Sequence, residues 1–120
     1  MNLYDKYGGT PAVAKIMRNF SMRVFARPNL KRYYREDLDM EALVRHQIEY
    51  VSYLMGKPVR EYAESYLKDK HANLGITNAS FNEVAQILRE ELIEAGCELP
   101  DVEILMNKVW EIQKHIVTRN

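Results

Sequence analysis

Residues 39–55 read DMEALVRHQIEYVSYLM, and this stretch carries the clearest helical pattern in the chain. Asp39 can cap the helix, and Glu41 lies near the positive end of its dipole. Apolar side chains at three- and four-residue spacing form one broad face: Met40, Leu43, Val44, Val51, Leu54 and Met55. Gln47 lies at the centre of that face, where its amide costs free energy unless it finds a hydrogen-bond partner. The Gly-Lys-Pro sequence at 56–58 then ends the helix.

The sequence on both sides of this stretch is also helical. After Gly8-Gly9, Thr10 can cap a helix with Pro11 at a first helical position, and this helix stops before Pro28. Ser80 and Glu83 predict a capping box for a helix that Gly96 ends. The apolar stripe of that helix is formed by Phe81, Val84, Leu88, Leu92 and Ala95. Pro100-Asp101 opens the last helix. Its inward-facing residues are expected to be Val102, Leu105, Met106, Val109, Ile112, Gln113 and Ile116. The chain is therefore predicted to be one all-α domain over 1–120, with four substantial helices and two or three short ones.

Charge and composition exclude several classes of partner. Seventeen basic and seventeen acidic residues leave no net charge, which argues against nucleic acid or a membrane surface held by bulk electrostatics. No apolar run approaches the roughly 20 residues that span a bilayer. The single Cys97 cannot form an internal disulfide, which fits a reducing cytoplasm. We therefore expect a cytoplasmic protein, and no long heptad pattern demands a partner, so we expect a monomer.

Two histidines 25 residues apart, His46 and His71, suggest a metal cofactor. Neutral imidazole is a common iron ligand, so two helical segments that present these side chains indicate a haem slot. The alternative readings are a half-exposed helix residue for His46 and a solvated surface group for His71, which follows Lys68-Asp69-Lys70. Gln47 is either a core residue whose amide is hydrogen-bonded within the protein or a hydrogen-bond donor inside the haem slot.

Several spaced motifs in one order resemble the truncated (two-on-two) haemoglobins along nearly the whole chain. They are LYDKYGG at 3–9, RVFARPNL at 23–30, Asp39-Met40 through His46-Gln47, and then Gly56, Tyr62, His71, Phe81 and Gly96. Within that family the chain resembles the first group, because Val84 stands where the other groups place a tryptophan. The resemblance implies a two-on-two helical sandwich around haem b.

The resemblance also implies roles for particular residues. His71 is the expected proximal iron ligand, and the residues expected around the haem are Phe20, Ser21, Tyr34, Leu43, Gln47, Phe81 and Val84. Tyr62 and Tyr66 are candidates for packing on the haem or contacting a propionate. Lys57, Arg60 and Lys68 either pair with propionates or form a solvated face.

Two departures from the family pattern affect the distal side, where a gas ligand binds. The family usually has tyrosine where this chain has Ser21, and a serine is too short to reach a ligand directly, although it can act through a water. Tyr34 replaces a common phenylalanine. We therefore expect Gln47, aided by Tyr34, to stabilise a bound ligand, and these departures weigh against tight oxygen storage and efficient NO dioxygenation.

One subset of the family has a distal histidine directly before the distal glutamine, and His46-Gln47 matches it. The same subset has a histidine in its last helix that bonds to a haem vinyl group. His115 falls near that position if the loop after Gly96 takes one extra residue. The resemblance therefore implies six-coordinate resting iron with His71 and His46 as axial ligands, and a covalent haem link through His115.

Three functions follow as alternatives. The first is a haem protein that binds O2, NO or CO reversibly and has a redox or gas-handling role with an unidentified reductase. The second is an enzyme, an NO dioxygenase or a peroxidase-like protein. The third is a haem-free helical interaction module, which predicts a colourless protein that hemin does not stabilise.

Overall fold

The computed structural model describes residues 2–58, 75–113 and 117, and the elements within these ranges are helices joined by turns and loops. The helices are α1 (Leu3–Lys6), α2 (Gly9–Phe25), α3 (Pro28–Lys31), α4 (Met40–Leu54), α6 (Asn78–Glu94) and α7 (Leu99–Glu111). The described ranges contain no strand element, as the helical periodicity predicts. Within them, no helix is both long and apolar enough to span a bilayer. The short helix expected ahead of His71 lies outside the described residues.

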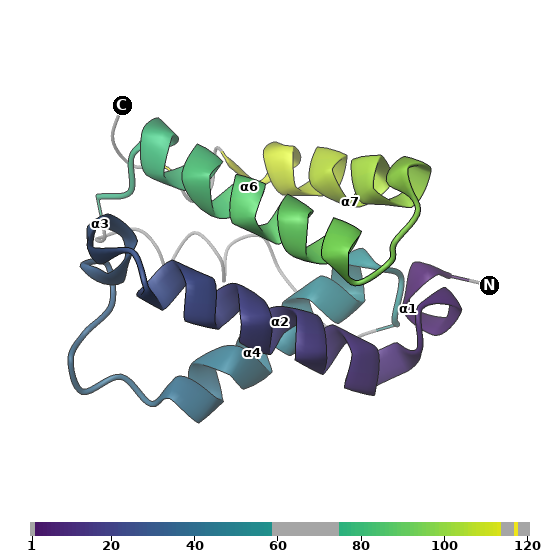
Figure 1. Cartoon of the computed structure of the whole chain (residues 1–120), viewed down its shortest axis with the longest axis horizontal. Helices are drawn as coiled ribbons and strands as arrows, with labels where there is room; N and C mark the ends of the chain where they lie inside the picture. The colour runs from purple at the N-terminus through teal and green to yellow at the C-terminus, as the bar shows by residue number, and fades with distance from the viewer. Residues whose placement is uncertain (1, 59–74, 114–116, 118–120) are drawn as a thin grey trace.

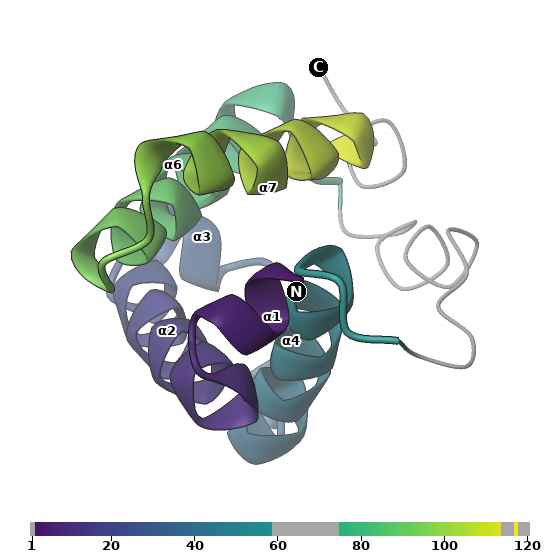
Figure 2. The same cartoon turned by 90° about the vertical axis from the view of Figure 1, so that its right-hand side faces the viewer.

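The long helices form two layers of two (Figure 1). Helices α6 and α7 lie side by side in opposite directions, while α2 and α4 make the second layer. Seen from the end, α6 and α7 lie above, and α2 and α4 lie below them (Figure 2). Helix α2 packs against both α4 and α6, so it joins the two layers. This two-on-two arrangement is the one that the sequence predicts.

The core is built mainly from α2, α6, α7 and the second half of α4. Its most completely buried large side chains are Val13, Val24, Leu30, Met55, Ile87, Leu92, Val102 and Met106. Helix α4 is asymmetric along its length. Val51 and Leu54 are buried near its end, whereas Leu43 and Val44 are only half-buried and Met40 is 40% exposed. The predicted apolar face of α4 is therefore covered by protein along its second half only.

The predicted helix ends are confirmed where they rest on strong stop signals. Helix α2 ends before Pro28, and Gly96, with a φ of 93°, follows α6. The Asp39 carboxylate accepts a hydrogen bond from the Ala42 amide at 3.2 Å, as expected of a cap. Ala95, expected on the buried stripe of α6, is exposed, because it is the residue that caps the end of the helix.

Two predicted N-terminal caps are wrong. Helix α2 begins at Gly9, with Gly8 as its cap, because the Thr10 hydroxyl is hydrogen-bonded to the hydroxyl of Tyr4. Pro11 is tolerated inside this first turn, where backbone N–H groups have no helical partner.

The second wrong cap is Ser80. Thr77 caps α6 instead, and its hydroxyl accepts a hydrogen bond from the Ser80 amide at 3.1 Å. The Ser80 hydroxyl accepts from Tyr33 at 2.9 Å, so it is occupied by a contact between distant segments. The expected capping-box acid, Glu83, binds Arg27 and Asn29.

Helix α1 ties the end of α4 to the start of α7. On the α4 side, the Tyr4 amide donates to the Met55 carbonyl and the Asn2 side chain donates to the Gly56 carbonyl, both at 3.0 Å. A Cβ on Gly56 would lie 2.7 Å from the Asn2 Cβ, so only glycine fits this contact at its φ of 103°. On the α7 side, the Asp101 carboxylate accepts from Lys6 Nζ at 2.7 Å and from the Tyr7 hydroxyl.

We predict that Asp101→Asn lowers stability at neutral pH. The hydrogen bonds from Lys6 and then Tyr7 hold the pKa of Asp101 below its ordinary 3.8. A lowered carboxyl pKa stabilises the fold above that ordinary value, and the stabilisation disappears as the pH falls through the lower folded pKa. Thermal unfolding should therefore separate the variant from the parent at pH 7, and the difference should shrink as the pH falls below 3.8.

The matched control for this change is Asp37→Asn. It also removes one carboxylate, but its pair with Arg35 is exposed to solvent on both sides, so it should have little effect. Equal melting temperatures for Asp101→Asn and the parent at pH 7 would contradict the role given to this contact.

Candidate functional site

A part-buried hydrogen bond joins the middle of α4 to α2. Ser21 is only 2% exposed, and its Oγ donates to Gln47 Oε1 at 2.6 Å. Both groups are polar and lie on helix faces that are otherwise apolar, where an unpaired hydroxyl or amide costs free energy. The partner that the sequence required for Gln47 is therefore Ser21, 26 residues earlier in the chain.

This bond fixes which end of the Gln47 amide is free to act as a donor. Because Oε1 accepts from Ser21, the amide group is held with its oxygen toward α2. The Nε2 atom carries two N–H groups and no acceptor, so it can only donate. The side chain thus offers N–H groups to an acceptor beside the two helices.

Apolar side chains that the sequence assigns to the site lie on both layers. Phe20, next to Ser21, is 6% exposed, and Phe81 on α6 is 7% exposed and packs against Trp110 with ring centroids 5.9 Å apart. Val84 is half-buried against the core. Leu43 and Val44 are half-buried, and neither is among the side chains packed on the core of the described residues. An apolar helix face that is only half-buried and carries a half-buried amide fits a flat apolar group that carries a polar ligand.

Tyr34 packs against Phe25 of α2, with ring centroids 4.8 Å apart. Burial raises the pKa of its phenol, so the hydroxyl stays protonated at neutral pH and remains a donor. Its expected role beside Gln47 stays a prediction, while its ring is fixed at the end of α2.

The histidines and their expected neighbours divide into two sets. His46 is described and lies exposed on α4, one residue before Gln47. The other predicted site residues fall outside the described residues: Tyr62, Lys68, His71 and His115. The roles given to these residues and to His46 stay predictions.

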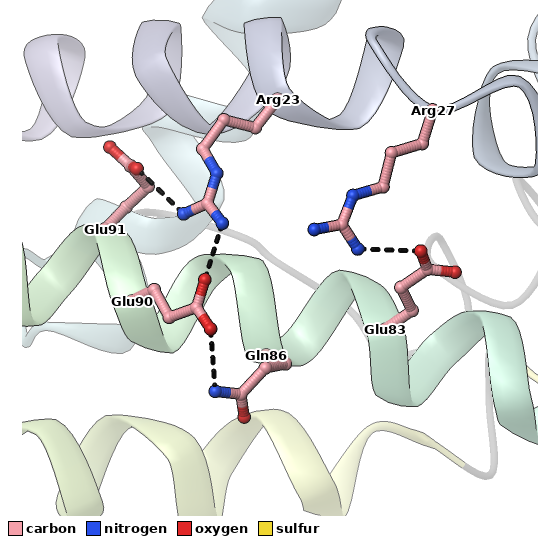
Figure 3. A network of polar contacts seen from close by, with 6 residues as sticks. All are labelled: Arg23, Arg27, Glu83, Gln86, Glu90 and Glu91. Carbon is pink, nitrogen blue, oxygen red and sulfur yellow. Dashed lines mark hydrogen bonds and ion pairs between the residues drawn. The ribbon is translucent and has the colours of Figure 1, made fainter.

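A network of ion pairs between α2 and α6 lies outside every sequence-based prediction (Figure 3). The Arg23 guanidinium donates to Glu91 at 3.0 Å and also to Glu90. Beyond the end of α2, Arg27 donates to Glu83 at 2.7 Å. Glu91 itself is 5% exposed, so one member of the network is buried in the core.

The electrostatics of this network follow from its geometry. The hydrogen bond from Arg23, and then that from Gln86, lowers the pKa of Glu90. Arg27 and then Asn29 lower the pKa of Glu83 in the same way. One sequence signal could have found the network: Glu91 falls three residues after Leu88 and one before Leu92, on an apolar stripe where a carboxylate requires a partner.

Fold and site together define a globin-class domain, in which two helix layers enclose a flat cofactor. The chain belongs to the bacterial-like globin family, whose model matches residues 2–118. As a globin it is a haem-binding protein, and diatomic gases are the ligands of the family. The all-helical two-on-two fold expected from the resemblance is thereby confirmed.

Individual relatives agree with this assignment. The chain is 28% identical over 117 residues to the group 1 truncated hemoglobin GlbN of Mycolicibacterium paratuberculosis, covering 98% of this chain and 85% of that one. It is 32% identical over 98 residues to the Synechocystis group 1 truncated hemoglobin GlbN, covering 78% and 77% of the two chains. Its fold matches the 2/2 hemoglobin of Synechococcus sp. PCC 7002, with a TM-score of 0.85, 23% identity, and 99% and 100% of the two chains covered.

We predict that Ser21→Ala destabilises the protein by about 1 kcal/mol, the usual net contribution of one hydrogen bond. It leaves the half-buried Gln47 side chain without the donor to its oxygen, so the side-chain amide signals of Gln47 should also shift in an NMR spectrum. Urea unfolding gives the stability change.

Ser52→Ala is the comparison for that experiment. It removes a hydroxyl that is equally buried, at 2% exposure, five residues beyond Gln47 on α4. If the two variants lose the same stability and the Gln47 amide signals stay in place, the Ser21 hydroxyl has no special relation to Gln47.

Proposed function

We propose that this chain is a group 1 truncated haemoglobin that binds diatomic gases reversibly and rests with six-coordinate iron. His71 is the proximal ligand and His46 the distal one. The part-buried Ser21–Gln47 hydrogen bond is the observation that carries this proposal, because it leaves an oriented N–H donor on the helix that also carries His46. Bound haem supplies an iron that takes two axial ligands and changes between the ferric and ferrous states.

The partly covered face of α4 supports a cofactor position against this helix. Leu43 and Val44 offer apolar contact, and Phe81 and Val84 offer it from α6. Such side chains exclude water from the iron and leave gas binding to a few polar groups. Gln47 is then the group that donates to the outer atom of a bound gas.

His46 can serve as a displaceable ligand. Its side chain is exposed, so binding to iron breaks no contact of a buried imidazole. A gas must first displace it, and the observed affinity then depends on how often the iron is free. Such a protein suits redox or NO and O2 handling, with a reductase as the expected partner and a monomer as the expected state.

We predict a six-coordinate low-spin spectrum for the purified protein with one equivalent of hemin. The absorption bands should be sharp and split after dithionite reduction without added ligand. His46→Ala should convert them to high-spin bands while the haem stays bound, and His71→Ala should weaken haem binding itself.

High-spin bands in the parent protein would end the six-coordinate proposal and leave the globin assignment in place. Low-spin bands that survive in His46→Ala would instead assign the second ligand to another side chain. Arg45→Ala is a suitable control, because it alters the exposed neighbour of His46 without removing an imidazole.

A covalent haem link through His115 is a separate part of the proposal. The Synechococcus sp. PCC 7002 hemoglobin was solved with covalently attached heme, and the position of His115 in this sequence resembles that of a vinyl-binding histidine. We predict that reduction of the hemin complex gives a product that keeps its haem in acid.

Denaturing mass spectrometry measures this directly, as a protein mass increased by one haem. His115→Ala should lose the adduct and keep the visible spectrum of the parent. An acid-extractable haem in the parent protein would refute the link and leave the axial ligands unaffected.

A further inference from the structure

Helix α2 makes polar contacts on two sides, close together along its axis. Ser21 binds Gln47 of α4, and Arg23 binds Glu90 and Glu91 of α6. Residues two apart on a helix point about 200° apart and rise about 3 Å along the axis. The serine and the arginine therefore anchor nearly opposite faces of the same turn of α2.

The contact on the α6 side is directional. Glu91 is 5% exposed, and its carboxylate accepts from Arg23 Nη1 at 3.0 Å, while the second guanidinium nitrogen donates to Glu90. A planar guanidinium holds two acceptors at fixed angles, whereas apolar packing has no preferred direction. Arg23 thus fixes both the rotation of α2 and its position along α6.

A second contact reinforces the first (Figure 3). Arg27 donates to Glu83 at 2.7 Å, and Asn29 donates to the other oxygen of the same carboxylate at 2.6 Å. The arginine number rises while the partner number falls, so α2 and α6 run in opposite directions along this line. Two anchors four residues apart resist sliding better than one.

We propose that Arg23 and Glu91 are positioning residues for the distal site. Their part-buried ion pair, in which Glu91 is the buried partner, holds α2 where the Ser21 hydroxyl reaches Gln47, and so keeps the Gln47 amide aimed at a bound gas. The role of Gln47 as the gas donor belongs to the proposed function, and this inference rests on it.

The distances make the site sensitive to small movements of α2. The Ser21–Gln47 bond is 2.6 Å long, and O–H···O hydrogen bonds span roughly 2.5–3.0 Å between the two oxygens. A movement of α2 away from α4 by about 0.5 Å or more therefore takes the bond out of that range. The serine side chain is too short to follow such a movement of the helix, because its oxygen is one bond from Cβ. A tyrosine hydroxyl lies at the end of a ring and reaches farther from the backbone.

The test is the rate of O2 dissociation from the reduced, haem-loaded protein, measured by displacement with CO. Glu91→Gln keeps the shape of the side chain and removes its charge. We expect it to speed O2 loss roughly threefold or more, within the range of coupling between contacting residues. The C–O stretching frequency of the ferrous CO complex should rise, since the bound gas loses a hydrogen-bond donor.

A double-mutant cycle separates positioning from general stability. Gln47→Leu should speed O2 loss by itself, and Glu91→Gln should add little in that background. Arg23→Lys is the second variant if Glu91→Gln folds poorly, since it keeps the positive charge and loses the planar fork. It should show the same change in dissociation rate and C–O frequency.

Glu103→Gln is the matched control, because Glu103 pairs with Arg89 and so joins α6 to α7 rather than to α2. It should leave both readouts unchanged. If Gln47→Leu speeds O2 loss but Glu91→Gln and Arg23→Lys lower only the melting temperature, the positioning role is overturned and the proposed function stands. If Gln47→Leu has no effect, the donor role in the proposed function fails and this inference fails with it.

Discussion

Helix α2 packs against α4 with one face and against α6 with the opposite face, so its position decides how the two layers meet. Apolar residues on α2, such as Val13, Met17 and Val24, are almost completely buried, but such packing tolerates small shifts. The polar contacts are fewer, and each depends more strongly on the distance and direction between its two groups. A buried hydroxyl and a buried carboxylate each need one partner at one distance, and both partners are met only in a single placement of the helix.

The sequence was sufficient to predict the long helices and the ends that glycine or proline imposes. Those features depend on periodicity and on backbone restrictions, which are local. At both caps that were predicted wrongly, Thr10 and Ser80, another residue uses the hydroxyl: Tyr4, six residues before Thr10, and Tyr33, 47 residues before Ser80. A cap is a competition for one oxygen atom, and helical periodicity alone does not identify the competitor, whether it is near in the sequence or far.

The same limit applies to the site. The central place of Gln47 on an apolar face was enough to predict that its amide needs a partner, and Ser21 was singled out only through its departure from the family pattern. That the two meet is a property of the α2–α4 packing. Arg23 was not predicted at all, since seven basic residues lie between 15 and 35 and nothing local distinguishes the one that faces Glu91.

Serine in place of tyrosine changes what the distal side can offer. The expected water-mediated role leaves the serine hydroxyl available to the ligand, but the hydroxyl donates its only proton to Gln47. On the proposed function, one amide then replaces two direct donors, so a bound gas is held less tightly and leaves sooner. A weakly held gas competes poorly with a distal histidine. The short side chain of Ser21 and the proposed ligation by His46 therefore both favour an iron that exchanges ligands and electrons over an iron that stores oxygen.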